Sequence, residues 1–242
     1  MPRSPRQIAA GVCFHVLNRG NGRQALFHKP ADYDAFVAIL AEAVRRHEVD
    51  LFAWVVMPNH WHLVLRPRRK EALVQFMRWL TVTHVRRHHQ HHRSDPGHLY
   101  QGRYKSFPVE EDEYFLALCR YVEANPVRAK LVTKAEQWKW SSLRQRLARI
   151  EEPLLTPWPV DRPRSWPALV NAPMDDAERQ RVQTSLNRGR PLGNEPWVKR
   201  TAAKLGLAST LNPRGRPRKP EAKLSKRQRQ RRMKEEERQK GK

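Results

Sequence analysis

Cysteine is scarce in this chain of 242 residues, which contains only Cys13 and Cys119. Two cysteines so far apart give neither the spacing of a zinc ribbon nor a disulfide framework, and this favours a reduced, cytoplasmic setting. The first residues are basic but lack the apolar core of a signal peptide. Because no run of eighteen apolar residues occurs either, we expect no segment to span a membrane.

Acidic residues are also few, with 24 Asp and Glu against 48 Lys and Arg, and the formal charge is +24. Such an excess predicts a polyanionic partner, most simply nucleic acid, and a nucleoid-associated location. The same totals would suit a ribosomal-type protein, so charge alone names no function. No Gly-x-x-x-x-Gly-Lys phosphate loop is found, and nothing in the sequence calls for nucleotide hydrolysis.

Apolar periodicity and turn residues predict the order β-α-β-β-α-β, followed by one more helix. The expected strands are 12–19, 49–57, 60–66 and 104–109, and the expected helices are 31–48, 70–92 and 112–125. This is the order of a ferredoxin-like sandwich, an α+β fold with an antiparallel sheet and helices on one face. We expect the other face of the sheet to stay free for a site. Pro108 predicts that the last strand lies at an edge.

Composition changes after residue 150, and we take residues 1–150 as the main domain. Six prolines between 153 and 173 predict a stiff, extended connector over 151–175 rather than a core element. A small helical extension is expected over 176–212, with helices near 175–187 and 196–205. The remaining 213–242 are charged and nearly free of large apolar residues, which is typical of a disordered basic tail.

Two histidines stand two residues apart in the expected strand 60–66, in the stretch Met57-Pro-Asn-His-Trp-His-Leu63. Side chains alternate along a strand, so His60 and His62 should share one face and Trp61 the other. Two imidazoles side by side can bind one divalent metal ion. Taken alone, the pair fits structural or surface histidines better.

The helix 112–125 supplies Tyr121 and, four residues later, Asn125 on the same helix face. A tyrosine hydroxyl can act as a nucleophile and form a covalent intermediate. An amide oxygen can be a third metal ligand, because hard divalent ions favour oxygen. Each residue also has a simpler interpretation, as a packing tyrosine and as a helix cap before Pro126.

Together these motifs resemble the single-tyrosine HUH transposases, and most closely the REP-associated tyrosine transposase branch. Three further stretches resemble the same branch: His15-Val-Leu-Asn-Arg-Gly20, Gln101-Gly-Arg-Tyr-Lys-Ser-Phe107 and Asn125-Pro-Val-Arg-Ala129. The resemblance covers residues 10–145. It implies a DNA strand transferase in which His60, His62 and Asn125 bind Mg²⁺ or Mn²⁺ and Tyr121 becomes joined to a 5′ phosphate. Family members of the insertion-sequence type usually have glutamine at the third position, so Asn125 would have to approach closer or act through water.

The resemblance further implies that the substrate is single-stranded, hairpin-forming DNA, such as repetitive extragenic palindromes, bound by a monomer or a homodimer. Two other hypotheses stay open: a regulatory DNA-binding protein that has lost cleavage, and a metal-dependent nuclease in which water attacks. We expect Trp61 or Tyr104 to stack on bases. The expected DNA contacts are Asn18, Arg19, Arg23, Arg103 and Lys105.

Two basic segments remain. The stretch Pro213-Arg-Gly-Arg-Pro-Arg-Lys219 resembles an AT-hook, which would lay Arg214 and Arg216 into a minor groove; a basic tail also produces such matches by chance. The run His84-Val-Arg-Arg-His-His-Gln-His-His-Arg93 has five histidines. We interpret it as a DNA-contacting helix end rather than a metal site, because its histidines should fall on several faces and its arginines would repel a metal ion.

Overall fold

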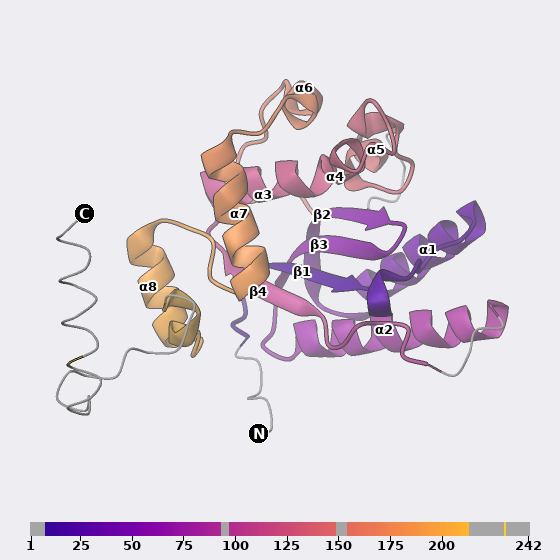
Figure 1. The fold of residues 1–242 in the computed structure, drawn as a ribbon, viewed down its shortest axis with the longest axis horizontal. Helices are drawn as coiled ribbons and strands as arrows, with labels where there is room; N and C mark the ends of the chain where they lie inside the picture. Colours follow the sequence, from indigo (N-terminus) through magenta and orange to yellow (C-terminus); the bar gives the residue numbers. More distant parts are fainter. Residues whose placement is uncertain (1–7, 93–96, 149–153, 213–229, 231–242) are drawn as a thin grey trace. The chain divides into compact units, whose positions relative to one another are not determined.

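The computed structural model describes residues 8–92, 97–148, 154–212 and 230. Its centre is an antiparallel sheet in the order β2-β3-β1-β4 (Figure 1). The strands are β1 (Cys13–Arg19), β2 (Val49–Met57), β3 (His60–Pro67) and β4 (Lys105–Val109). This order and the antiparallel pairing confirm the predicted ferredoxin-like α+β fold, with β4 at an edge.

Helices α1 (Pro30–Arg46) and α2 (Ala72–His91) cover one face of the sheet. Their apolar stripes fit the predicted periodicity, and Phe36 and Phe76 are fully buried against the side chains of Trp61 and Leu63 from β3. Burial of these large side chains is the main favourable contribution to this half of the core. Both helices begin and end within two residues of the predicted bounds.

The other face of the sheet is covered too, which corrects the expectation that it stays free. Helix α3 (Glu113–Glu123) packs on it through Phe115, Leu118 and Val122, and Figure 1 shows α2 and α3 on opposite sides of the sheet. Helices α5 (Ser142–Leu147), α6 (Trp166–Asn171), α7 (Asp176–Arg188) and α8 (Glu195–Lys204) follow along the chain, with short 3-10 turns η1 (Asn21–Arg23), η2 (Ala135–Gln137) and η3 (Ala208–Leu211).

The chain does not continue α3 through Asn125, as the sequence predicted. The helix ends at Glu123, Ala124 lies between, and a short helix α4 (Asn125–Arg128) begins at once. Pro126 has no N–H to donate, so it interrupts the hydrogen-bond ladder, yet its fixed φ suits the first turn of a new helix. The proline therefore opens α4 instead of ending the helical stretch.

The proline-rich stretch is the second difference. Helix α6 lies inside the expected connector, with Trp166 and Val170 only 3% and 1% exposed. Pro167 is the second residue of this helix, where a missing N–H costs little, while Pro163 precedes the helix and Pro173 follows it. The connector therefore contributes to the core on the α3 side, and the compact unit extends to Leu211.

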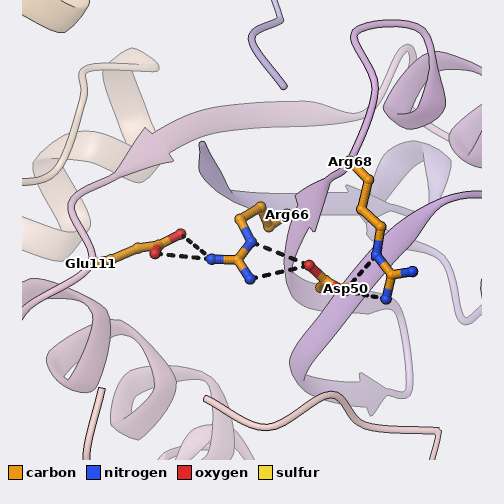
Figure 2. A network of polar contacts seen from close by, with 4 residues as sticks. All are labelled: Asp50, Arg66, Arg68 and Glu111. Atoms are coloured by element: carbon orange, nitrogen blue, oxygen red, sulfur yellow. Dashed lines mark hydrogen bonds and ion pairs between the residues drawn. The ribbon is translucent and has the colours of Figure 1, made fainter. Parts of the chain in front are cut away.

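An ion-pair network joins the far end of the β2–β3 hairpin to the start of α3 (Figure 2). The Arg66 guanidinium donates through Nε and Nη2 to Asp50 and through Nη1 to Glu111. Arg68 donates to the other oxygen of the Asp50 carboxylate. Asp50 is buried and Arg66 and Glu111 are partly buried, whereas Arg68 is exposed. The link through Arg66 therefore holds the segment before α3 against the sheet with little screening by salt.

In the part of the chain that the structure describes, no helix is both long and apolar enough to cross a membrane.

The burial of Trp166 generates a stability prediction. Trp166→Ala removes a large buried ring and leaves Glu123, which accepts from its indole N–H at 2.6 Å, short of one donor. We expect the free energy of unfolding in urea to fall by about 3–5 kcal/mol. Leu147→Ala, at a side chain 48% exposed in α5, should change it by less than ~0.5 kcal/mol. Equal stability of the two variants would contradict a core role for α6.

Candidate active site

His60 and His62 stand at the start of β3, next to the tight turn that follows β2. Arg19 is paired with His60 and Leu17 with His62 across the β1–β3 ladder, so all four side chains share one face. The two imidazole centroids lie 5.0 Å apart. Trp61 faces the other way, fully buried, and its indole N–H donates to the Tyr100 hydroxyl. The predicted alternation is confirmed, but Trp61 cannot stack on DNA.

Each histidine of the pair is held through Nδ1. His60 Nδ1 lies 2.7 Å from Asn59 Oδ1, and His62 Nδ1 lies 2.9 Å from His15 Nε2. An amide oxygen only accepts, so His60 carries its proton on Nδ1 and its Nε2 keeps a free lone pair. The same holds for His62 when His15 Nε2 is the acceptor of their hydrogen bond. Neither Nε2 makes a hydrogen bond to any residue that the structure describes. Outer hydrogen bonds of this kind orient metal-binding histidines.

The surroundings keep these imidazoles neutral. Burial, followed by the charges of Arg19 and Arg128, lowers the pKa of His60 to about 4. Burial is also the largest cause that lowers the pKa of His62, with His15, His60 and the same two arginines adding to it. Burial alone lowers the pKa of His15 to about 3. Neutral imidazole is the form that binds a metal ion.

Tyr121 lies over this pair. Helix α3 packs its apolar face on the sheet, and this places the Tyr121 ring centroid 6.4 Å from that of His62. The side chain is 6% exposed. Its hydroxyl accepts a long hydrogen bond of 3.4 Å from Gln183 Nε2 of α7. The structure therefore brings together the three residues that the sequence proposed as nucleophile and metal pair.

Asn125, four residues after Tyr121, already has hydrogen-bond partners for its side chain. Its Nδ2 donates to the carbonyls of Tyr121 and Val122, which joins α3 to α4 across the break at Ala124. Its Oδ1 accepts from Arg128 Nη2 at 2.8 Å. An amide oxygen has two lone pairs, so one remains that could face an ion. Among the described residues, no three His, Cys, Asp or Glu side chains form a ready metal site, so any third ligand to the pair must be of another kind.

Arg128 is the site residue that the sequence analysis missed. Its guanidinium carbon lies 3.8 Å from the centroid of the Tyr121 ring, and its Nη1 donates to the Tyr121 carbonyl. With Arg19 it puts two positive charges beside the histidine pair. Its position three residues after Asn125 and seven after Tyr121 is helical spacing, and this signal could have identified it. His15, Asn59 and Gln183 carried no comparable signal.

The predicted DNA contacts fall in different places. Arg19 and Lys105 lie on the face of the histidine pair, since Lys105 pairs with Leu17. Asn18 points to the opposite face, is buried and bonds to Gly102, while Arg23 and Arg103 are exposed. Arg214 and Arg216, with the whole AT-hook-like stretch, lie outside the described residues. Of the predicted contacts that the structure describes, Arg19 and Lys105 lie on the face of the candidate site.

Comparison with known proteins finds a family model that matches this part of the chain. Residues 9–125 match the family model described as transposase, IS200-like. This segment includes both histidines, Tyr121 and Asn125. Residues 9–125 therefore resemble the IS200-like transposases.

One solved structure resembles this chain in fold, and a second aligns more weakly. A structure described as a REP-associated tyrosine transposase bound to a REP hairpin aligns with a TM-score of 0.51 at 20% identity, covering 64% of this chain and 90% of that one. A crystal structure of a candidate transposase from Deinococcus radiodurans R1 aligns with a TM-score of 0.36 at 23% identity, covering 50% of this chain and 96% of that one. The comparison with curated proteins gave no match.

The lowered histidine pKas predict acid sensitivity. Between pH 6.5 and about 4 the unfolded chain protonates its histidines while His15 and His60 stay neutral in the fold. The unfolded state then binds more protons, so stability falls as the pH falls through this window. We expect the free energy of unfolding in urea to drop by at least ~2 kcal/mol from about pH 7 to about pH 5.

Two variants check the source of this drop. His15→Phe removes one buried imidazole and should flatten the dependence on pH. His91→Ala removes an exposed imidazole and should leave it unchanged. Equal stability of the wild-type chain at the two pH values would contradict the account.

Proposed function

We propose that this transposase cleaves and rejoins single-stranded DNA through a 5′-phosphotyrosine on Tyr121. The observation that carries the proposal is the position of the Tyr121 ring beside His62, with neither histidine Nε2 hydrogen-bonded to a described residue. The position of a nucleophile next to a metal-binding pair is what strand transfer requires.

We propose Mg²⁺ or Mn²⁺ as the metal at the histidine pair, where oxygens of Asn125 and of the DNA phosphate would supply the ligand type that these ions prefer. His60 and His62 would hold the ion through Nε2, and the oxygen of Asn125 would be a third ligand beside its bond to Arg128. When bound, a divalent ion supplies Lewis-acid charge to the oxygens of the scissile phosphate. The two imidazoles are oriented beforehand by Asn59 and His15, which lowers the cost of assembling the site.

The reaction at Tyr121 exchanges one phosphodiester bond for another and needs no nucleotide hydrolysis. Its oxygen attacks phosphorus and loses its proton, the bond from phosphorus to the 3′ oxygen breaks, and that oxygen leaves as a 3′-OH after it takes up a proton. Attack of a 3′-OH on the phosphotyrosine reverses the step and joins strands. Arg19 and Arg128 lie where their charge attracts the phosphate. The ring of Tyr121, held under Arg128, has little freedom to leave this position.

We propose hairpin-forming DNA as the partner. The support is the net charge of +24 and the fold likeness to a transposase that was solved with a REP hairpin. Arg19 and Lys105 share the face of the histidine pair, so both would offer a DNA strand a cationic contact there.

One observation favours the non-cleaving alternative. Tyr121 is only 6% exposed and its hydroxyl already accepts from Gln183. A DNA-binding regulator of the same fold would bind hairpins and form no covalent product. A third class, in which water attacks, would cleave without a covalent product.

The nucleophile is tested with labelled hairpin DNA and Mn²⁺ on a denaturing gel. We expect a covalent protein–DNA band that Tyr121→Phe abolishes, because phenylalanine has no oxygen to attack. Tyr114→Phe on the same helix and Tyr104→Phe should keep it. Cleavage that survives Tyr121→Phe would favour water as the nucleophile, and binding without any product would favour the regulator.

The third ligand is tested by the Mn²⁺ concentration that gives half-maximal cleavage. If Asn125 binds the ion, Asn125→Ala should raise this concentration by at least about tenfold, as for loss of other groups that support a metal. Arg128→Gln should reduce the maximal rate of cleavage. It should not raise the Mn²⁺ concentration for half-maximal cleavage, because it removes a positive charge that repels the ion. If Asn125→Ala leaves this Mn²⁺ concentration unchanged, Asn125 is not a metal ligand and only stabilises α4 and the position of Arg128.

A further inference from the structure

Helix α2 carries His84 and His88 on one buried face, and His92, directly after its last residue, continues this row. His89 and His91 are exposed on other faces, as the sequence predicted. His84, His88 and His92 are spaced by four residues, and the spacing of an α-helix stacks such side chains. The ring centroids of His84 and His88 lie 6.2 Å apart, and those of His88 and His92 lie 4.6 Å apart. The arginines between them are exposed and lie on other faces.

A fourth imidazole joins this row from a distant part of the sequence. His28, just before α1, lies 4.8 Å from His92 and 6.0 Å from His88 by ring centroids. The rings of His28, His88 and His92 therefore form a triangle with sides between 4.6 and 6.0 Å. Nitrogens at about 2.0–2.1 Å from one tetrahedral ion would put imidazole centres roughly 5 Å apart.

His88 is the member of the triangle that lacks an explanation in the fold. It is 7% exposed, and both of its ring nitrogens are buried with no hydrogen-bond partner. Burial and then the neighbouring imidazoles of His92, His28 and His89 lower its pKa to about 4, so it is neutral. A buried polar group without a partner is costly, and an ion or water usually satisfies it.

Asp32 ties the parts of the triangle together. Its Oδ1 lies 3.2 Å from His92 Nε2, while its Oδ2 accepts from the backbone N–H groups of His28 and Lys29. A carboxylate on one ring nitrogen fixes the tautomer and raises the basicity of the other nitrogen, as is common around metal-binding histidines.

We propose that His28, His88 and His92 form a second metal site, for a divalent transition-metal ion of the Zn²⁺, Co²⁺ or Ni²⁺ class, with Asp32 orienting His92. Imidazole nitrogens select this class over Mg²⁺. The described side chains do not yet surround one point. Binding therefore requires the rings to turn, and His28 is exposed and free to do so.

This site is separate from the histidine pair of the transposase site. It lies on the α1 and α2 side of the sheet, whereas His60, His62 and Tyr121 lie on the α3 side. Metal binding by His28, His88 and His92 is therefore independent of the proposed strand transfer and can be measured by itself.

The test uses the untagged full-length protein with His60→Ala and His62→Ala, so that the transposase pair cannot bind. After chelation, Co²⁺ is titrated and followed by its visible absorption, and Zn²⁺ is titrated by calorimetry. We expect one equivalent of each ion to bind. Adding His28→Ala and His92→Ala should weaken binding by at least about tenfold, whereas adding His91→Ala should not.

Three outcomes would overturn the proposal. The first is no binding by the His60→Ala, His62→Ala protein. The second is unchanged binding after His28→Ala and His92→Ala. The third is equal weakening by His91→Ala, which would mean loose binding by surface histidines. Circular dichroism of the metal-free variants checks the fold, and replacing the exposed His28 alone gives a variant without loss of buried packing.

Discussion

The packing of α3 against the sheet is the constraint on which the candidate site depends. His60 and His62 are fixed by β3, but Tyr121 reaches them only because α3 lies across that face. Glu123, two residues after Tyr121, is fully buried and accepts from the Ser142 hydroxyl and the Trp166 indole. Burial raises the pKa of Glu123, while Arg146 and these two donors act to lower it. Partnered on each side, this carboxylate fastens the end of α3 to α5 and α6.

The proline-rich region therefore has a part in the site. Trp166 bonds to Glu123, and Arg120 of α3 donates to the carbonyls of Leu169, Ala172 and Pro173 around the end of α6. Gln183 of α7 then reaches the Tyr121 hydroxyl. Segments beyond the matched residues 9–125 thus support the helix that carries the nucleophile proposed here.

Local sequence patterns predicted the order of strands and helices in the sheet domain and part of the candidate site. Alternation along β3 placed His60 and His62 together, and helical spacing put Tyr121 near Asn125. Long-range contacts could not be predicted in this way: His15 meets His62 through strand register, and Gln183 meets Tyr121 through the packing of α7. Helical spacing could have identified Arg128. The position of its side chain over the Tyr121 ring, however, depends on the break between α3 and α4 at Ala124. The sequence did not predict the burial of Trp166, because a proline-rich stretch usually indicates an extended connector.

The two histidine clusters share one physical link. Trp61, between His60 and His62, donates to the Tyr100 hydroxyl, which lies 2.6 Å from His84 Nδ1. One strand thus presents two imidazoles to α3 and, through Trp61, a hydrogen-bonded contact to the histidine row of α2. This arrangement explains why Trp61 is buried and hydrogen-bonded instead of serving as a stacking surface.

The central claim is that Tyr121 is the residue joined to DNA. The most direct measurement is mass spectrometry of the protein after reaction with hairpin DNA and Mn²⁺, nuclease trimming and digestion with trypsin. The account predicts a nucleotide mass on the peptide Tyr121–Arg128, which follows the cleavage after Arg120. A nucleotide mass on a peptide with Tyr104 or Tyr114, or on none, would contradict it.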